Sequence, residues 1–185
     1  MGVLAPMVDG HLAPSRAVMM LLRHLAAFLA LPFVVTVVIP VYVQRRNHLF
    51  LRWPEGTSAM LAVIAGAIVL LLGLTLFAAS VYEFATRGRG TLAPWDPPRA
   101  LVVRGPYQYV RNPMISGVLL LLIAEALLLR SLPHAEWAGT FAVINAIYIP
   151  LLEEPQLKAR FGDAYREYCR NVPRLVPRLS PWRAV

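Results

Sequence analysis

Long uninterrupted runs of apolar residues constrain this sequence more than any other feature. Four such runs cover residues 18–43, 58–84, 113–129 and 137–152. They lack the alternation of half-buried strands and the 3.6-residue spacing of amphipathic helices. A helix needs about 20 apolar residues to cross a bilayer. We therefore expect an all-α integral membrane protein with about four transmembrane helices.

The composition indicates that most of the chain lies in the lipid bilayer. Of the 185 residues, 58% are hydrophobic and 15% are charged, whereas soluble domains carry about 25% charged residues. The apolar runs leave room for short connections and for no separate soluble domain. We expect one membrane domain spanning residues 1–185, with a polar loop at 86–112 and a polar tail at 153–185.

The basic residues predict how the chain is oriented. The formal net charge is +8, but no zinc-finger or helix-turn-helix spacing accompanies it, and we expect membrane lipids and no nucleic acid as partners. Lys and Arg divide fourteen to four between the two sides of the membrane when both termini lie on the same side. The positive-inside rule then predicts cytoplasmic N- and C-termini.

A single cysteine limits the chemistry. With Cys169 alone, an intramolecular disulfide and a multi-cysteine metal site are excluded. We expect no metal site and interpret Cys169 as a packed thiol.

Glycine and proline predict local features of the first two spans. Pro32 and Pro40 should kink the first. Small side chains at Ala62, Gly66 and Gly73 should let a neighbouring helix approach the second closely.

The third and fourth spans should form a helical hairpin. Only residues 130–136 separate them, and so short a connection forces the two helices to run antiparallel. The start of the third span, at Pro113, and the end of the fourth, near Leu152, should therefore lie at the same membrane face.

The polar tail should begin with another helix. Leu157, Phe161, Tyr165 and Tyr168 follow helical spacing, which predicts an amphipathic helix at the membrane interface. Pro173 should end it.

Two segments that the hairpin brings together contain groups suited to a zwitterionic ligand. Around the third span's start, Arg111 and the amides of a helix that begins at Pro113 would attract a carboxylate. At the fourth span's end, Glu153 and Glu154 would attract a cation or ribose hydroxyls. Each element also has a plainer explanation, as a topology charge, a helix end in water or an interfacial anchor.

The order and spacing of these residues resemble the isoprenylcysteine carboxyl methyltransferase and phospholipid methyltransferase family. The resemblance covers about residues 101–177. It is carried by Arg104-Gly105-Pro106-Tyr107-Gln108-Tyr109-Val110-Arg111-Asn112-Pro113-Met114, Gly117, Glu153-Glu154-Pro155-Gln156-Leu157, Phe161-Gly162, Tyr165, Tyr168 and Val172-Pro173-Arg174.

This resemblance implies an S-adenosylmethionine-dependent membrane methyltransferase that acts on a lipophilic or amphipathic small molecule. The methyl acceptor would be a carboxylate, a thiol or a phospholipid amine. Residues implied in catalysis are Glu154, Arg111 and Arg174. Residues implied in cofactor binding are Gly105, Tyr107, Arg111, Asn112, Pro113, Glu153, Glu154 and Tyr165.

Two departures from the family pattern bear on the acceptor. Asn112 and Ile115 stand where prenylcysteine methyltransferases usually have His and Tyr, which weakens the case for a prenylated cysteine. Two alternatives stay open: a non-catalytic four-helix scaffold or lipid-binding protein, and a sterol-type membrane reductase with a nicotinamide cofactor.

Overall fold

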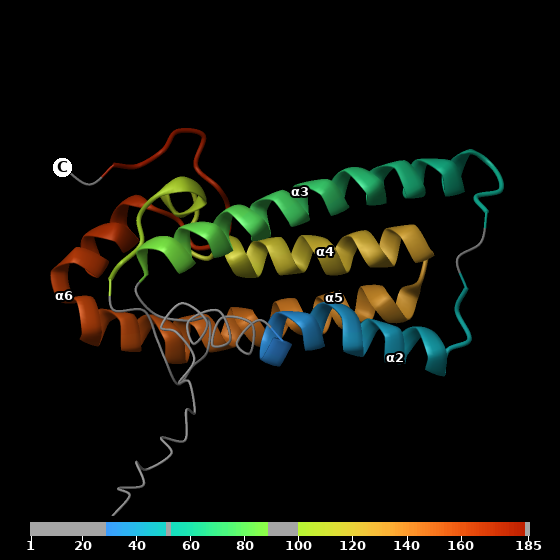
Figure 1. Ribbon diagram of the computed structural model, residues 1–185, viewed down its shortest axis with the longest axis horizontal. Helices are drawn as coiled ribbons and strands as arrows, with labels where there is room; N and C mark the ends of the chain where they lie inside the picture. The colour runs from blue at the N-terminus through green and yellow to red at the C-terminus, as the bar shows by residue number, and fades with distance from the viewer. Residues whose placement is uncertain (1–28, 51–52, 89–99, 184–185) are drawn as a thin grey trace, which may run out of the picture.

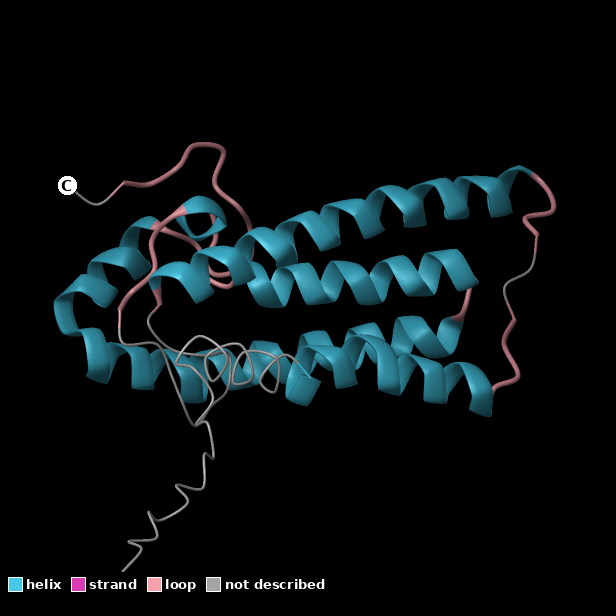
Figure 2. Ribbon diagram, viewed as in Figure 1, coloured by secondary structure: helices cyan, strands magenta, loops and turns pink. Residues whose placement is uncertain are grey.

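Helices make up all the regular structure in the described part of the chain. The computed structural model describes residues 29–50, 53–88 and 100–183, and no strand occurs within them (Figure 2). Helices α2, α3, α4 and α5 run along the long axis of the molecule (Figure 1). The all-α expectation is confirmed for these residues.

The first apolar run changes helix type beside its second proline. A π-helix, η1 (Leu29–Val38), passes directly into α2 (Ile39–Arg46). Pro32 lies inside η1 and Pro40 opens α2. Proline removes a backbone donor and crowds the preceding turn, which favours wider or kinked helical geometry. The predicted beginning of this span, residues 18–28, lies outside the described residues.

The next two apolar runs form the helices that the sequence predicts. Helix α3 (Thr57–Arg87) begins one residue before the predicted span and ends three residues after it. Helix α4 (Pro113–Leu129) has the predicted bounds, with Pro113 at its first turn.

Glycines bring α3 and α4 into close contact. A Cβ atom at Gly66 would lie 2.9 Å from Cγ of Leu128, and one at Gly73 would lie 3.1 Å from nearby α4 atoms. The contact is reciprocal, because a Cβ at Gly117 of α4 would lie 2.9 Å from the backbone nitrogen of Phe77. The predicted role of Gly66 and Gly73 as close-packing positions is confirmed.

The hairpin between α4 and α5 (Leu132–Tyr148) is tighter than expected. Arg130 ends α4 in the left-handed conformation, with φ of 48°. Ser131 then caps α5, its hydroxyl accepting from the backbone N–H of His134 at 3.4 Å. A cap at this position satisfies a free helix-start donor, so the helix begins five residues before the predicted start at 137.

The fourth span does not end near Leu152 as the sequence predicts, because its helix continues into the tail without a break. Helix α5 continues through a π-helical turn, η3 (Ile149–Glu153), into α6 (Glu154–Asn171). Pro150 lies in η3, where its missing donor favours the wider turn. The chain then bends within α6 at Gly162, whose φ of 55° and ψ of −128° are not helical. In Figure 1 this bent helix forms the end of the molecule opposite the α4–α5 turn.

The long helices have a surface suited to lipid. Within the part of the chain that the structure describes, two helices, α3 and the continuous Leu132–Asn171 helix, are long and apolar enough to cross a membrane, while α4 is apolar but shorter. Only 11% and 17% of their most apolar windows are buried inside the protein. A core helix of a soluble protein would be mostly buried, so the exposed apolar surface supports a membrane protein.

Candidate functional site

The start of α4 and the end of the α5–η3 helix meet at one end of the molecule, as the hairpin argument predicts. Pro113 is buried at the first turn of α4. Asn112 precedes it with φ of −120° and ψ of 60°, and its side chain makes no capping hydrogen bond. Backbone amides at the start of α4 are therefore not capped by this side chain.

Glu154 joins three segments that lie far apart in the sequence. Its Oε1 atom lies 3.0 Å from Nη1 of Arg111 and 2.7 Å from Nε of Arg174. Its Oε2 atom lies 4.0 Å from Nζ of Lys158. Only 5% of Glu154 is exposed, so these contacts form in a partly dehydrated environment, where ion pairs are strengthened.

The two neighbouring carboxyl groups have opposite acid–base character. Burial by itself would raise the pKa of Glu154, but the hydrogen bond from Arg174 and the charges of Arg111, Arg174 and Lys158 hold that pKa below its usual range. Burial, and secondarily the charge of Glu154, raises the pKa of Glu153. Glu154 is therefore a persistent anion, and Glu153 is the better proton acceptor of the two.

Arg111 makes further contacts that its sequence position did not reveal. Its Nη1 atom also lies 2.8 Å from Sγ of Cys169, and its backbone N–H donates to the carbonyl of Pro173 at 2.9 Å. Its Nε atom is buried and has no hydrogen-bond partner within the described structure. Cys169 is thus packed, as expected, but it is packed against a predicted site residue.

Aromatic residues form one wall beside this charge cluster. The buried Tyr168 donates from its hydroxyl to the carbonyl of Tyr107 at 2.6 Å. Its ring centre lies 6.1 Å from that of Tyr165 and 5.9 Å from that of Trp182. Burial, together with the charges of Glu153 and Glu83, raises the pKa of Tyr107. The predicted residues Tyr107 and Tyr165 therefore lie in the same buried region.

Gly105 has both steric and conformational reasons to be glycine. Its φ is 54°, and a Cβ atom there would lie 3.0 Å from Cγ of Glu83 on α3. An L-residue would be strained in this conformation and would also press on α3. Gly105 therefore lets the segment before α4 pass close to the end of α3.

The chain after α6 is held along the segment that carries the predicted motif. The backbone N–H groups of Arg178 and Trp182 donate to the carbonyls of Tyr109 and Gln108 at 2.9 and 3.0 Å. The side-chain amide of Gln108 donates to the carbonyl of Trp182 at 3.1 Å. This pairing is not visible in the sequence, because no pattern of residue types signals hydrogen bonds between backbones about 70 positions apart.

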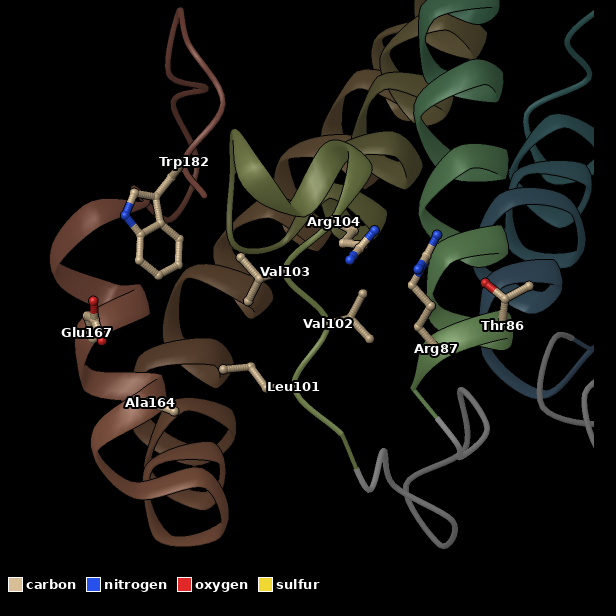
Figure 3. Close-up of a pocket in the computed structure, with 9 residues that line it drawn as sticks. All are labelled: Thr86, Arg87, Leu101, Val102, Val103, Arg104, Ala164, Glu167 and Trp182. Atoms are coloured by element: carbon tan, nitrogen blue, oxygen red, sulfur yellow. The ribbon is translucent and has the colours of Figure 1, made fainter. Parts of the chain in front are cut away.

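A hollow of about 600 Å³ adjoins these segments, and we call it the α3–α6 hollow. Figure 3 shows Arg87 and Arg104 on its α3 side and Glu167 and Trp182 on its α6 side, with Leu101 and Val103 between them. Its lining residues are Thr86, Arg87, Leu101, Val102, Val103, Arg104, Ala164, Glu167 and Trp182. None of the predicted site residues is among these nine, although Arg104 directly precedes Gly105, and Ala164 directly precedes Tyr165.

Exposed apolar helices and a buried cluster of charged and aromatic residues at one end define a membrane protein with a polar site. Residues 61–164 match the phospholipid methyltransferase family, and the chain belongs to that family. The chain is therefore a membrane protein of a methyltransferase class.

One curated relative also carries a methyltransferase name. The chain is 41% identical over 78 residues to methanethiol S-methyltransferase 2 of Bradyrhizobium diazoefficiens. This match covers 40% of the chain and 27% of the relative. No solved structure matches the chain.

Proposed function

We propose that this protein transfers the methyl group of S-adenosylmethionine to a lipophilic or amphipathic acceptor. The observation that carries the proposal is the meeting of Arg111, Glu154 and Arg174 in a family of methyltransferases. Charges placed in this way suit a ligand that itself carries a carboxylate, an ammonium and a sulfonium.

The residues of the site fit such a cofactor. Nε of Arg111 is buried without a hydrogen-bond partner in the described structure, and a ligand carboxylate would satisfy it. Among the described residues, the Oε2 atom of Glu154 has its only ion-pair contact with Lys158 at 4.0 Å, and a ligand ammonium or ribose hydroxyl could replace that long contact. Gly105, Asn112 and Pro113 would bring backbone groups to the same ligand, with Tyr107 and Tyr165 as neighbouring aromatic surface.

The bound cofactor would supply an electrophilic methyl group on a sulfonium. This chain's residues would mainly align the donor with the acceptor and exclude water, which suffices when the leaving group is good. Arg111 would bind the donor's carboxylate, Glu154 would bind its ammonium or ribose, and Arg174 would hold Glu154 in place. The α3–α6 hollow offers apolar surface for the less polar part of a ligand.

The acid–base character of the two glutamates bears on the acceptor. Because two guanidinium groups keep the pKa of Glu154 low, Glu154 is a poor base for a protonated phospholipid amine, and such an acceptor would have to use Glu153, whose pKa burial raises. An acceptor that is already anionic, such as a thiolate or a carboxylate, needs no base. The name of the Bradyrhizobium relative is consistent with a thiol, and we rank a thiol first among the three acceptor classes.

The orientation of the protein is part of the proposal. With four spans and both termini in the cytoplasm, the site would lie at the cytoplasmic membrane face, where the cofactor is available. The excess of Lys and Arg on that side supports this orientation.

The test is a labelling experiment with purified protein, S-adenosylmethionine labelled in its methyl group, and three substrate sets: alkyl thiols, prenylated cysteine and phosphatidylethanolamine. We expect label in the thiol products. A control with Glu154→Gln should lose most of the labelling. Absence of label from every set, together with no stabilisation of the protein by the cofactor, would contradict the proposal.

Family membership favours this proposal over the two alternatives. A scaffold or lipid-binding protein should ignore S-adenosylmethionine in a thermal unfolding assay, and a reductase should respond to a nicotinamide cofactor instead. Both ligands can be compared in the same assay.

A further inference from the structure

The chain after α6 combines firm attachment with exposed aliphatic side chains. We call residues 173–183 the tail segment. Its backbone is held by the hydrogen bonds to Gln108, Tyr109 and Arg111 described above. Yet Leu175 is 50% exposed, Val176 is 76% exposed and Leu179 is fully exposed. Because the backbone hydrogen bonds hold this segment in place, the positions of these exposed side chains are fixed relative to the helices.

Charge in the same stretch is of one sign. Between residues 170 and 183 the sequence has four arginines and no acidic residue. Arg174 is engaged with Glu154, while Arg170 and Arg183 are exposed. Aliphatic side chains interleaved with arginines are the composition of segments that bind anionic membrane surfaces.

The position of the tail segment agrees with such a surface. In Figure 1 the tail segment bends outside the helices, close to the level along the long axis at which α4 begins. Since α4 is apolar from its first turn, this level marks the edge of the apolar part of the molecule. Side chains that project outward from the protein near the start of α4 would therefore meet the boundary between lipid headgroups and acyl chains.

We propose that the tail segment, together with Arg170 at the end of α6, docks on the anionic membrane surface, with Leu175, Val176 and Leu179 at the headgroup–acyl boundary and Arg170 and Arg183 among the lipid phosphates. This surface contact is distinct from methyl transfer and from the membrane spans. Because Arg174 belongs to the same segment, the docked tail also keeps one guanidinium partner of Glu154 at the membrane edge.

The test places a tryptophan on the proposed surface. Leu179→Trp is compared with Asp163→Trp, whose position is also exposed and directly follows the bend of α6 at Gly162. Each variant is reconstituted in brominated phosphatidylcholine vesicles, with and without phosphatidylglycerol. Wild-type fluorescence is subtracted to isolate the new tryptophan.

We expect bromine to quench most of the emission from Trp at position 179 and little from position 163. Quenching at 179 should be stronger with phosphatidylglycerol. In these vesicles the double variant Arg170→Gln/Arg183→Gln should lower the ratio of docked to undocked tail, obtained from the quenching, by about fivefold for each charge removed. Equal quenching in neutral and anionic vesicles would overturn the anionic preference. If bromine does not quench the tryptophan at position 179, this side chain contacts water or another protein and not lipid, and the proposed docking is wrong. The readout uses no methyl donor, so it is independent of the proposed catalytic activity.

Discussion

Arg111 and Glu154 lie 43 positions apart in the sequence, yet Nη1 of Arg111 and Oε1 of Glu154 are 3.0 Å apart in a partly dehydrated environment. The α4–α5 hairpin produces this contact, because two antiparallel helices of similar length return the chain to the level from which it left. Both helices have 17 residues. The site therefore depends on the length of the hairpin as well as on the identity of the two residues.

Glu154→Gln tests the centre of the site. The amide keeps the shape of the side chain but loses the charge that holds Arg111 and Arg174, so we expect S-adenosylmethionine to bind at least tenfold more weakly, since a charged hydrogen bond contributes about 1.5–3 kcal/mol. Isothermal titration of the purified variant measures this, and a thermal unfolding curve checks that it is folded. Unchanged affinity would remove Glu154 from the cofactor site.

The same residue predicts how stability depends on pH. The pKa of folded Glu154 is lower than that of the unfolded chain, so its stabilising contribution is complete above the unfolded pKa and is lost as the pH falls through the folded pKa. Wild type should therefore be more stable than Glu154→Gln near neutral pH, and the difference should shrink in acid. Unfolding temperatures measured between about pH 7 and pH 3 would show it. A difference that stays constant throughout this range would contradict the assignment.

The α3–α4 contact can be tested with two alanine substitutions. Gly117→Ala places a Cβ atom 2.9 Å from the backbone nitrogen of Phe77, and we expect a loss of about 1–3 kcal/mol in the free energy of unfolding as the helices move apart. Gly139→Ala is the matched control, because this α5 position has nothing within 4 Å of the added atom. The control should be neutral or slightly stabilising, as alanine favours helix more than glycine does. Equal effects of the two substitutions on thermal unfolding in detergent would argue against the close contact.

Tyr168→Phe tests the aromatic wall. Its hydroxyl donates to the carbonyl of Tyr107 at 2.6 Å in a buried position, and removing it should cost about 1–3 kcal/mol, since the carbonyl loses its buried partner. Tyr82→Phe, at a position that is 65% exposed, should change the stability little. Thermal unfolding of both variants provides the comparison. If Tyr168→Phe were as stable as Tyr82→Phe, the hydrogen bond would have no net effect on folding.

Residue types and their spacing alone determined the positions of most helices in this protein and one of the contacts between them. Apolar runs predicted the helices, Pro113 predicted the start of α4, and Gly66 and Gly73 predicted where α3 and α4 approach. These are local properties, since the number of apolar residues, the donor that proline lacks and the small volume of glycine act wherever they occur.

Only the tertiary structure decided what Glu154 contacts and where the tail segment is held. The sequence placed Arg111, Glu154 and Arg174 in one neighbourhood, but their shared carboxylate oxygen, the contact of Arg111 with Cys169, and the pairing of residues 108–111 with 173–182 required coordinates. The continuous α5–η3–α6 helix was also unexpected, because the end of the apolar run near Leu152 predicted the end of the fourth span, whereas a π-helical turn joins that span directly to the helix of the tail. Contacts between distant segments depend on how whole helices pack, and no local pattern of residues encodes that geometry.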